Sequence, residues 1–229
     1  MLYGLIFDVD GVIADTEPPT ATATIRMFEQ LFAVKDVRAE DFEAGLGKGP
    51  EAYILAAAEI HGLQLSNEQL ARAVAAREEN FISLLRESPV PPFPGVLELM
   101  EAALGRPDFR LAIATSSSRR MSQVVLEGAG VPYEKMAYVS GSDVTHKKPH
   151  PEIFLRAAER MGIEPGRCVV IEDTIGGVQA AGAAGTKCIA VTNTTTPENL
   201  AQADVICRSL EEISVQTIVD LVDGRVVGS

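Results

Sequence analysis

The amino-acid sequence predicts an α/β protein with a doubly wound, Rossmann-like parallel sheet as its core and an inserted α-helical subdomain. Short apolar segments recur along the chain without polar alternation, which is typical of parallel strands that are covered on both faces. Helical patterns lie between most of these segments. The stretch between Phe7 and Leu111 breaks this alternation, because it contains only helical patterns.

The core elements follow from these patterns. Six segments are predicted as strands: Tyr3–Phe7, Leu111–Thr115, Met136–Val139, Cys168–Ile171, Lys187–Val191 and Asp204–Cys207. Four segments are predicted as helices: Val96–Leu104, Ser118–Gly128, Pro151–Met161 and Ile175–Ala184. Proline at the start and Gly162 at the end of the third helix form a favourable pair of terminal residues.

The inserted subdomain is predicted to contain three helices, at about Thr20–Phe32, Pro50–His61 and Ser66–Arg86. The third helix opens with Ser66-Asn-Glu-Gln69, which is a capping-box pattern. The proline-rich segment Ser88–Gly95 is expected to be a stiff linker. We therefore predict a helical cap domain at residues 16–89 and a core domain formed by residues 1–15 and 90–229.

Composition and charge narrow the functional class. The 229 residues are 46% hydrophobic and 23% charged, which is ordinary for a soluble globular protein. The net charge is -12, and the sequence has no cluster of Lys and Arg that could form a basic face for nucleic-acid phosphates, so nucleic-acid binding is not expected. The chain has no apolar segment of about 18 residues and no signal-peptide pattern, so we expect no membrane span. These features favour a cytoplasmic protein with a small-molecule partner. We expect a monomer or weak homodimer, although no sequence feature points to the oligomeric state.

The three cysteines, Cys168, Cys188 and Cys207, lie far apart in apolar segments. We interpret them as buried, reduced thiols in strands rather than as metal ligands or a disulfide.

Polar side chains follow four of the predicted strands. In open α/β sheets, ligands bind beyond the carboxyl ends of the strands, so these residues are expected to meet at one edge. In chain order they are Asp8 and Asp10, Thr115–Ser118, Lys148, and Glu172 with Asp173.

Such a group of carboxylates requires compensating charge, and Mg²⁺ bound through oxygens supplies it. A carboxylate such as Asp8, beside a bound phosphate, can attack phosphorus and form an acyl phosphate. Asp10 can protonate the leaving oxygen and then activate water. Lys148 offsets negative charge, while the Thr115 hydroxyl and nearby backbone N–H groups can hold phosphate oxygens.

Four sequence segments resemble the ordered motifs of the haloacid dehalogenase (HAD) superfamily. They are FDVDGVIADTE, ATSSS, KKPHPEIF and VIEDTIGGVQAAGAAG. The resemblance extends over nearly the whole chain, including the helical insertion after the first strand. Within the superfamily, the sequence is similar to the branch of β-phosphoglucomutases and CbbY-like phosphatases.

The resemblance implies a role for each matching residue. Asp8 corresponds to the nucleophile and a metal ligand, and Asp10 to the acid/base, with its backbone carbonyl on the metal. Lys148 corresponds to the motif lysine. Asp173 corresponds to a metal ligand, and Glu172 binds the metal directly or through water.

The same resemblance assigns the transferring phosphoryl group to Thr115 and Ser116. Ser117 and Ser118 either contact that group or cap the following helix. The dehalogenase branch lacks the acid/base aspartate, so the presence of Asp10 argues against carbon–halogen chemistry.

Two cap residues are candidates for substrate contact. Lys48, in the turn Gly45–Gly49, either reaches an anionic substrate or is a solvated lysine. Arg77 matches a cationic position of the mutases but is equally compatible with a plain helix surface. Thr20 stands where the β-phosphoglucomutases carry a histidine, and Lys48 or Pro50 stands near their cap-loop arginine, so both differences weaken the mutase interpretation.

Three main hypotheses follow. The leading one is a Mg²⁺-dependent phosphatase that acts on a sugar or other metabolite phosphate through an aspartyl phosphate. The second is a phosphosugar mutase of the β-phosphoglucomutase type, and the third is a HAD-like scaffold that binds a metabolite without turnover. A dehalogenase is a distant fourth.

Overall fold

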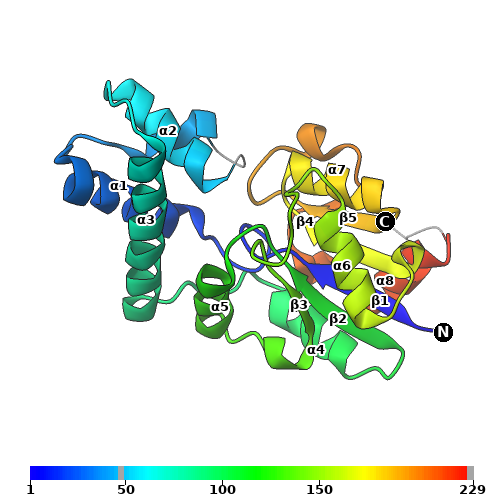
Figure 1. Ribbon diagram of the computed structural model, residues 1–229. Helices are drawn as coiled ribbons and strands as arrows, with labels where there is room; N and C mark the ends of the chain where they lie inside the picture. Colours follow the sequence, from blue (N-terminus) through cyan, green and yellow to red (C-terminus); the bar gives the residue numbers. More distant parts are fainter. Residues whose placement is uncertain (46–48, 226–229) are drawn as a thin grey trace. The chain divides into compact units, whose positions relative to one another are not determined.

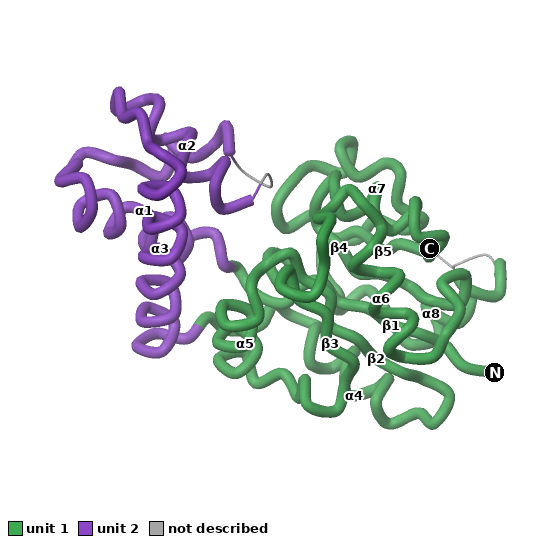
Figure 2. The backbone as a smooth tube through the Cα atoms, viewed as in Figure 1, with its two compact units in different colours: residues 1–15, 90–229 green, residues 16–89 purple. Residues whose placement is uncertain are grey.

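The computed structural model describes residues 1–45 and 49–225. The chain separates into two compact units, drawn in different colours in Figure 2. Unit 1 comprises residues 1–15 and 90–229, and unit 2 comprises residues 16–89. Unit 2 is therefore one continuous segment, whereas unit 1 is built from two segments.

A six-stranded parallel sheet forms the centre of unit 1, with the strand order β3-β2-β1-β4-β5-β6. The strands are β1 (Tyr3–Phe7), β2 (Phe109–Ala114), β3 (Ala137–Val139), β4 (Cys168–Glu172), β5 (Lys187–Val191) and β6 (Val205–Cys207). The chain builds outward from β1 on one side and then returns to β4 on the other. The order thus reverses next to β1, which is where ligands bind in doubly wound sheets. The predicted fold class is confirmed.

Helices cover both faces of this sheet (Figure 1). The helices of unit 1 are α4 (Val96–Leu104), α5 (Arg119–Gly128), α6 (Glu152–Met161), α7 (Ile175–Ala184) and α8 (Val215–Val222). α6 and α7 pack on the face that presents Ile6, Ala112 and Val170, all with no exposed surface. α4 and α8 pack against β1, β2 and β4 from the other side. Burial on both faces explains why these strands lack polar alternation.

One helix of unit 1 was not predicted. α8 contains eight residues and begins at Val215, after the N-cap residue Ser214, whose side chain accepts a hydrogen bond from the Thr217 backbone N–H. Its buried side chains, Ile218, Val219 and Leu221, pack onto the sheet. A segment of barely two turns carries too few periodic positions to be distinguished from an irregular apolar tail, so tertiary packing decides its structure.

The described residues of unit 2 form three α-helices and a 3₁₀ segment: α1 (Glu17–Phe32), α2 (Pro50–Ile60), α3 (Asn67–Glu87) and Ala39–Gly45. Phe42 stacks on Tyr53 with ring centroids 4.5 Å apart, within a core shared by α1 and α2. The predicted capping box is confirmed, because Ser66 and Gln69 exchange both hydrogen bonds. α1 begins three residues earlier than expected, since two prolines are compatible with its first turn.

The three cysteines are buried in β4, β5 and β6 and form no disulfide, as predicted. Among the helices of the described residues, none is both long and apolar enough to cross a membrane.

Candidate active site

The pairing of the central strands brings the predicted polar residues to one edge of the sheet. Phe7, the last residue of β1, lies beside Ile113 of β2 and Ile171 of β4. The residues that follow these three strands therefore start at the same level. Asp8 is consequently close to Lys148 and Glu172, which are 140 and 164 positions away in the sequence.

Lys148 joins two buried carboxylates at this edge. Its Nζ donates a 2.6 Å hydrogen bond to Asp8 Oδ1 and also contacts Glu172 Oε1 at short range. Asp8 is 6% exposed and Glu172 is fully buried. The ammonium group is therefore the positive charge next to the carboxylates at the ends of β1 and β4.

Burial dominates the acid–base properties of this group. Desolvation raises the pKa of Asp8 to about 8, although attraction to Lys148 opposes the rise. Burial, together with repulsion from Glu172 and Asp8, raises the pKa of Asp173 well above its ordinary value. Burial alone would lower the pKa of Lys148, but its two carboxylate neighbours outweigh that effect and raise it. The single lysine thus does not offset the desolvation of both aspartates.

Glu172 is held rigidly by the start of α7. Its Oε2 accepts hydrogen bonds from the backbone N–H groups of Asp173 (2.9 Å) and Thr174 (3.1 Å) and from the Thr174 hydroxyl (3.0 Å). A Cβ at Gly177 would lie 1.8 Å from Glu172 Cδ, so a side chain there would occupy the place of the carboxylate. Glycine at this position is therefore required by the close approach of helix and carboxylate.

Asp173 has one carboxylate oxygen without a partner. Its Oδ2 accepts a short hydrogen bond from the Thr194 hydroxyl, whereas Oδ1 is buried and no donor among the described residues binds it. One carboxylate oxygen each from Asp8, Glu172 and Asp173 lies within 4.8 Å of the others. An unpaired buried oxygen beside two other carboxylates is costly, and a hard cation bound through oxygens removes that cost. The residues present therefore fit Mg²⁺.

Asp10 is held by the loop that follows β2. Its Oδ2 accepts hydrogen bonds from the Ser117 hydroxyl at 2.6 Å and from the Thr115 hydroxyl at 3.3 Å. Thr115 is fully buried, and its oxygen also accepts the Ser117 backbone N–H at 3.0 Å. Ser116 lies between these two residues. The Thr115 and Ser117 hydroxyls, predicted to hold phosphate, are thus both engaged with Asp10.

Ser118 caps α5, since its side chain accepts the backbone N–H of Met121 at 3.3 Å. Of the two alternatives for Ser118, the structure therefore shows the cap.

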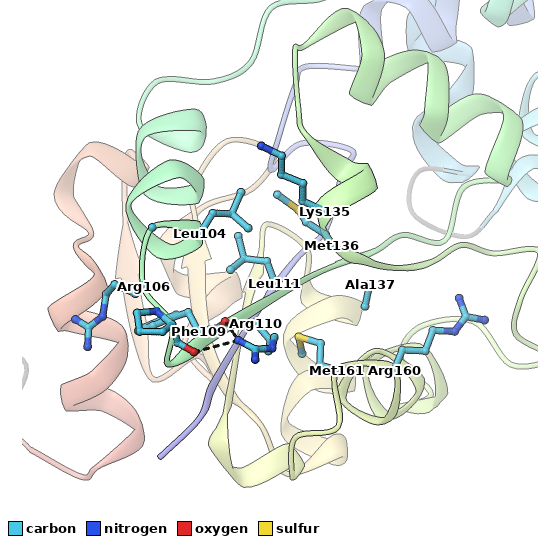
Figure 3. Close-up of a pocket in the computed structure, with 12 residues that line it drawn as sticks. Leu104, Arg106, Phe109, Arg110, Leu111, Lys135, Met136, Ala137, Arg160 and Met161 are labelled. Carbon is cyan, nitrogen blue, oxygen red and sulfur yellow. Dashed lines mark hydrogen bonds between the residues drawn. The ribbon is translucent and has the colours of Figure 1, made fainter.

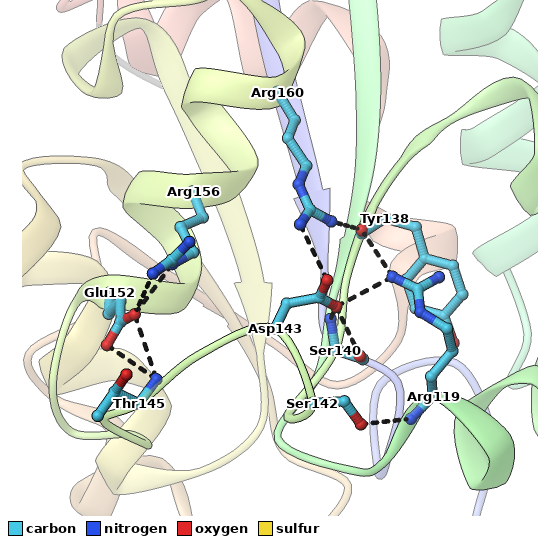
Figure 4. A network of polar contacts seen from close by, with 9 residues as sticks. All are labelled: Arg119, Tyr138, Ser140, Ser142, Asp143, Thr145, Glu152, Arg156 and Arg160. Carbon is cyan, nitrogen blue, oxygen red and sulfur yellow. Dashed lines mark hydrogen bonds and ion pairs between the residues drawn. The ribbon is translucent and has the colours of Figure 1, made fainter.

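A turn next to this loop was missing from the sequence predictions. In the turn Ser140–Asp143, the carboxylate of Asp143 accepts hydrogen bonds from Ser140 and from the guanidinium groups of Arg119 and Arg160 (Figure 4). These contacts, together with burial, which acts in the opposite direction, leave the pKa of Asp143 well below its usual range. Arg119 is thus committed to this turn.

Two other contributing residues follow β5. The Thr194 hydroxyl binds Asp173, and the Asn193 side chain donates a 2.8 Å hydrogen bond to the Gly11 carbonyl. Gly11 has φ of +77°, and a Cβ there would lie 1.9 Å from Asp173 Oδ2. Asp8 and Glu172 were predicted by reading the residues that follow each strand. The same reading at the end of β5 would also have identified Asn193 and Thr194.

The structure describes one of the two cap residues that were predicted to contact the substrate. Lys48 lies outside the described residues. Arg77 is 8% exposed within unit 2, where its Nε donates to the Thr24 hydroxyl at 3.1 Å and its guanidinium lies over the Tyr53 ring. The interpretation of Arg77 as a plain helix-surface residue is wrong, because its guanidinium packs inside the unit.

A cavity of about 740 Å³ lies at the amino ends of the strands, opposite the carboxyl ends that carry Asp8 (Figure 3). Its lining includes Phe109 and Ala137, the first residues of β2 and β3. The amino ends of parallel strands lie away from the edge that carries Asp8. This cavity is therefore no part of the candidate active site.

The sequence matches the family model for haloacid dehalogenase-like hydrolases over residues 4–185. The fructose-1-phosphate phosphatase YqaB of Escherichia coli (strain K12) is 35% identical over 80% of this chain and 92% of that protein. The protein CbbY of Rhodobacter capsulatus is 29% identical over 96% of this chain and 99% of that protein. SUPPRESSOR OF QUENCHING 1 of Arabidopsis thaliana is 30% identical over 93% of this chain, which spans only 20% of that protein.

Solved structures show the same fold. CbbY from Rhodobacter sphaeroides, crystallised as a mutant with xylulose-(1,5)-bisphosphate, superposes with a TM-score of 0.81 at 28% identity, over 93% of this chain and 96% of that one. A β-phosphoglucomutase from Clostridium difficile superposes with a TM-score of 0.82 over 98% of both chains. Its identity of 23% supports a common fold and nothing further.

Proposed function

Because the chain belongs to the haloacid dehalogenase-like hydrolase family, it is an enzyme, and we propose that it is a Mg²⁺-dependent phosphatase. The substrate class we propose is a small phosphomonoester, a sugar or other metabolite phosphate. The observation that carries the proposal is the buried group of Asp8, Glu172 and Asp173, with Lys148 between two carboxylates and one Asp173 oxygen unpaired. The name of YqaB, a fructose-1-phosphate phosphatase, and the bisphosphate bound to CbbY support a phosphorylated substrate.

The metal would be held by the carboxylates of Asp8 and Asp173 and by the Asp10 backbone carbonyl, with Glu172 binding directly or through water. When bound, Mg²⁺ supplies positive charge that favours ionised carboxylates and neutralises phosphate oxygens. Without it, burial keeps the pKa of Asp8 near 8, so much of this side chain is protonated at neutral pH.

Asp8 is the nucleophile in this proposal. Its ionised carboxylate attacks the phosphorus atom, the ester oxygen leaves, and an aspartyl phosphate forms on Asp8. Lys148 contacts Asp8 directly, so its ammonium group can move little while charge passes from the carboxylate to the phosphoryl group. A charge fixed in place before the reaction stabilises the transition state without the cost of reorientation.

Asp10 moves the proton. It donates a proton to the leaving ester oxygen and later accepts one from the water that hydrolyses the aspartyl phosphate. The hydroxyls of Ser117 and Thr115 hold its carboxylate on one side, which fixes its orientation for both steps. We further propose that Ser116 and the backbone N–H groups of this loop hold the phosphoryl oxygens.

The remaining expectations follow from the same proposal. Unit 2 serves as the cap that selects the substrate, with Lys48 as a candidate contributor. Arg77, which packs inside unit 2, is not retained as a substrate contact. The buried, reduced cysteines support a cytoplasmic location. We propose a monomer or weak homodimer as the active form.

The first test is a phosphate-release assay on a panel of sugar phosphates and other phosphate esters, with Mg²⁺ and with EDTA. Release should require Mg²⁺ and should be lost in Asp8→Asn. Full Mg²⁺-dependent activity in Asp8→Asn would exclude the nucleophile proposed here. The matched control is Asp108→Asn, since Asp108 pairs with Arg106 at the amino end of β2, away from the site.

The mutase alternative has a separate assay. Conversion of β-glucose 1-phosphate to glucose 6-phosphate faster than phosphate release would favour a mutase. Dominant phosphate release from the same substrate supports the phosphatase.

A further inference from the structure

The turn Ser140–Asp143 is organised around one carboxylate. Asp143 Oδ2 accepts hydrogen bonds from the Ser140 backbone N–H (2.8 Å), the Ser140 hydroxyl (2.6 Å) and Arg119 Nη2 (2.9 Å). Its Oδ1 accepts Arg160 Nη2 at 2.9 Å. Figure 4 shows the two guanidinium groups approaching Asp143 from α5 and α6. The carboxylate thus connects the end of β3 to both helices.

This turn is fastened to the loop that follows β2. The Gly141 backbone N–H donates a 2.8 Å hydrogen bond to the Ser117 carbonyl, and Ser142 Oγ accepts the Arg119 backbone N–H at 3.3 Å. The fit is close, because a Cβ at Gly141 would lie 2.1 Å from the Ser116 carbonyl oxygen. A displacement of the turn is therefore transmitted to Ser116 and Ser117.

Ser117 in turn holds Asp10. Its hydroxyl is the nearer of the two that bind Asp10 Oδ2, at 2.6 Å. We infer that Asp143 is a positioning residue for the acid/base step: it fixes the turn, the turn fixes the Ser116–Ser117 loop, and that loop sets the orientation of the Asp10 carboxylate. This inference rests on the proposed function, and it assigns Asp143 no contact with substrate.

The charge of Asp143 matters as much as its shape. Arg119 also lies over the Tyr138 ring, with its guanidinium carbon 4.3 Å from the ring centroid, and Arg160 contacts the Tyr138 carbonyl. Two cations therefore converge on one carboxylate. An asparagine would keep the volume but would offer one acceptor oxygen in place of two, and it would remove the negative charge that both guanidinium groups share.

The test is a double-mutant cycle between Asp143→Asn and Ser117→Ala, read out as kcat and KM for phosphate release. We expect Asp143→Asn to lower kcat roughly 10- to 100-fold, as a displaced catalytic group does, while KM changes less than about twofold. Because Asp143 acts through Ser117, the kcat of the double variant should be close to that of the slower single variant. Two independent effects would multiply instead, and the double variant would then be slower than either single variant.

The control is Asp108→Asn, which removes a carboxylate that binds Arg106 by two hydrogen bonds at the other edge of the sheet. It should leave kcat unchanged. Thermal melting of each variant confirms that all are folded at the assay temperature.

The outcomes separate this inference from the proposed function. If the wild-type chain releases no phosphate from any ester, the proposed function fails. If the wild type is active but Asp143→Asn retains its kcat, or its effect multiplies with that of Ser117→Ala, the positioning role is overturned. An equal loss of kcat in Asp108→Asn also overturns it, because the effect would then be a general loss of stability.

Discussion

Replacing the proposed nucleophile should stabilise the metal-free protein at high pH. Desolvation holds the pKa of Asp8 at about 8 in the folded state, against 3.8 for the ordinary side chain. Between these two pH values the folded protein binds more protons than the unfolded chain, so its stability falls as pH rises. A difference of this size corresponds to roughly 6 kcal/mol at most, since one pKa unit equals about 1.4 kcal/mol.

The other charged groups of the site do not reverse this sign. The raised pKa of Asp173 adds to the loss of stability as pH rises above its ordinary value of 3.8. Lys148 has a raised pKa as well, but a lysine contributes constant stability below its unfolded value of 10.5. The asparagine of Asp8→Asn cannot ionise. This substitution should therefore remove the part of the pH-dependent loss of stability that Asp8 causes and leave the part that Asp173 causes.

The assay is urea unfolding in EDTA at several values between pH 5 and pH 9. The wild type should lose several kcal/mol of unfolding free energy between pH 5 and pH 8, and Asp8→Asn should lose less. At pH 8 the variant should be the more stable protein by roughly 2–5 kcal/mol. Mg²⁺ at 100 times its Kd should restore about 2.7 kcal/mol to the wild type and less to the variant. Parallel pH curves for the two proteins would refute the burial argument.

Three further perturbations test separate parts of the site. Asp10→Asn should lower the steady-state rate of phosphate release by roughly 10²- to 10⁴-fold, the range of a lost general acid/base, and an unchanged rate would remove Asp10 from the mechanism. Gly177→Ala should lower the free energy of unfolding in urea by about 1–3 kcal/mol, because its Cβ would displace Glu172. Gly176→Ala should not lower it, because a Cβ there has nothing within 4 Å. Equal effects of the two substitutions would contradict this packing. Arg77→Ala should lower unfolding free energy by roughly 1–3 kcal/mol through lost hydrogen bonding and packing, and a wild-type melting temperature would argue against a structural role.

The sequence allowed the sheet to be predicted because its strands are buried on both faces. A segment such as Cys168–Glu172 must then be continuously apolar until it reaches the edge, where Glu172 begins the polar site. The convergence of Asp8 with Lys148 and Glu172 was also predictable, because parallel strands end at a common edge whatever their separation in sequence.

Contacts between side chains in irregular segments were not predictable in the same way. The turn around Asp143 depends on two arginines from different helices, and no periodic pattern in the sequence predicts these contacts. The burial of Arg77 depends on how three helices of unit 2 pack around Tyr53. Both arrangements arise from tertiary packing, which local sequence rules do not encode.

The discontinuity of unit 1 has a consequence for evolution and for engineering. The two places where the chain leaves and re-enters unit 1 are joined within that unit by a bridge between Ala14 and Pro92 and by a 2.8 Å hydrogen bond from the Phe93 N–H to the Ile13 carbonyl. Segments inserted between neighbouring points of a scaffold are well tolerated. Residues 16–89 can thus be exchanged by a single genetic replacement, while every carboxylate of the candidate active site stays with its own strand.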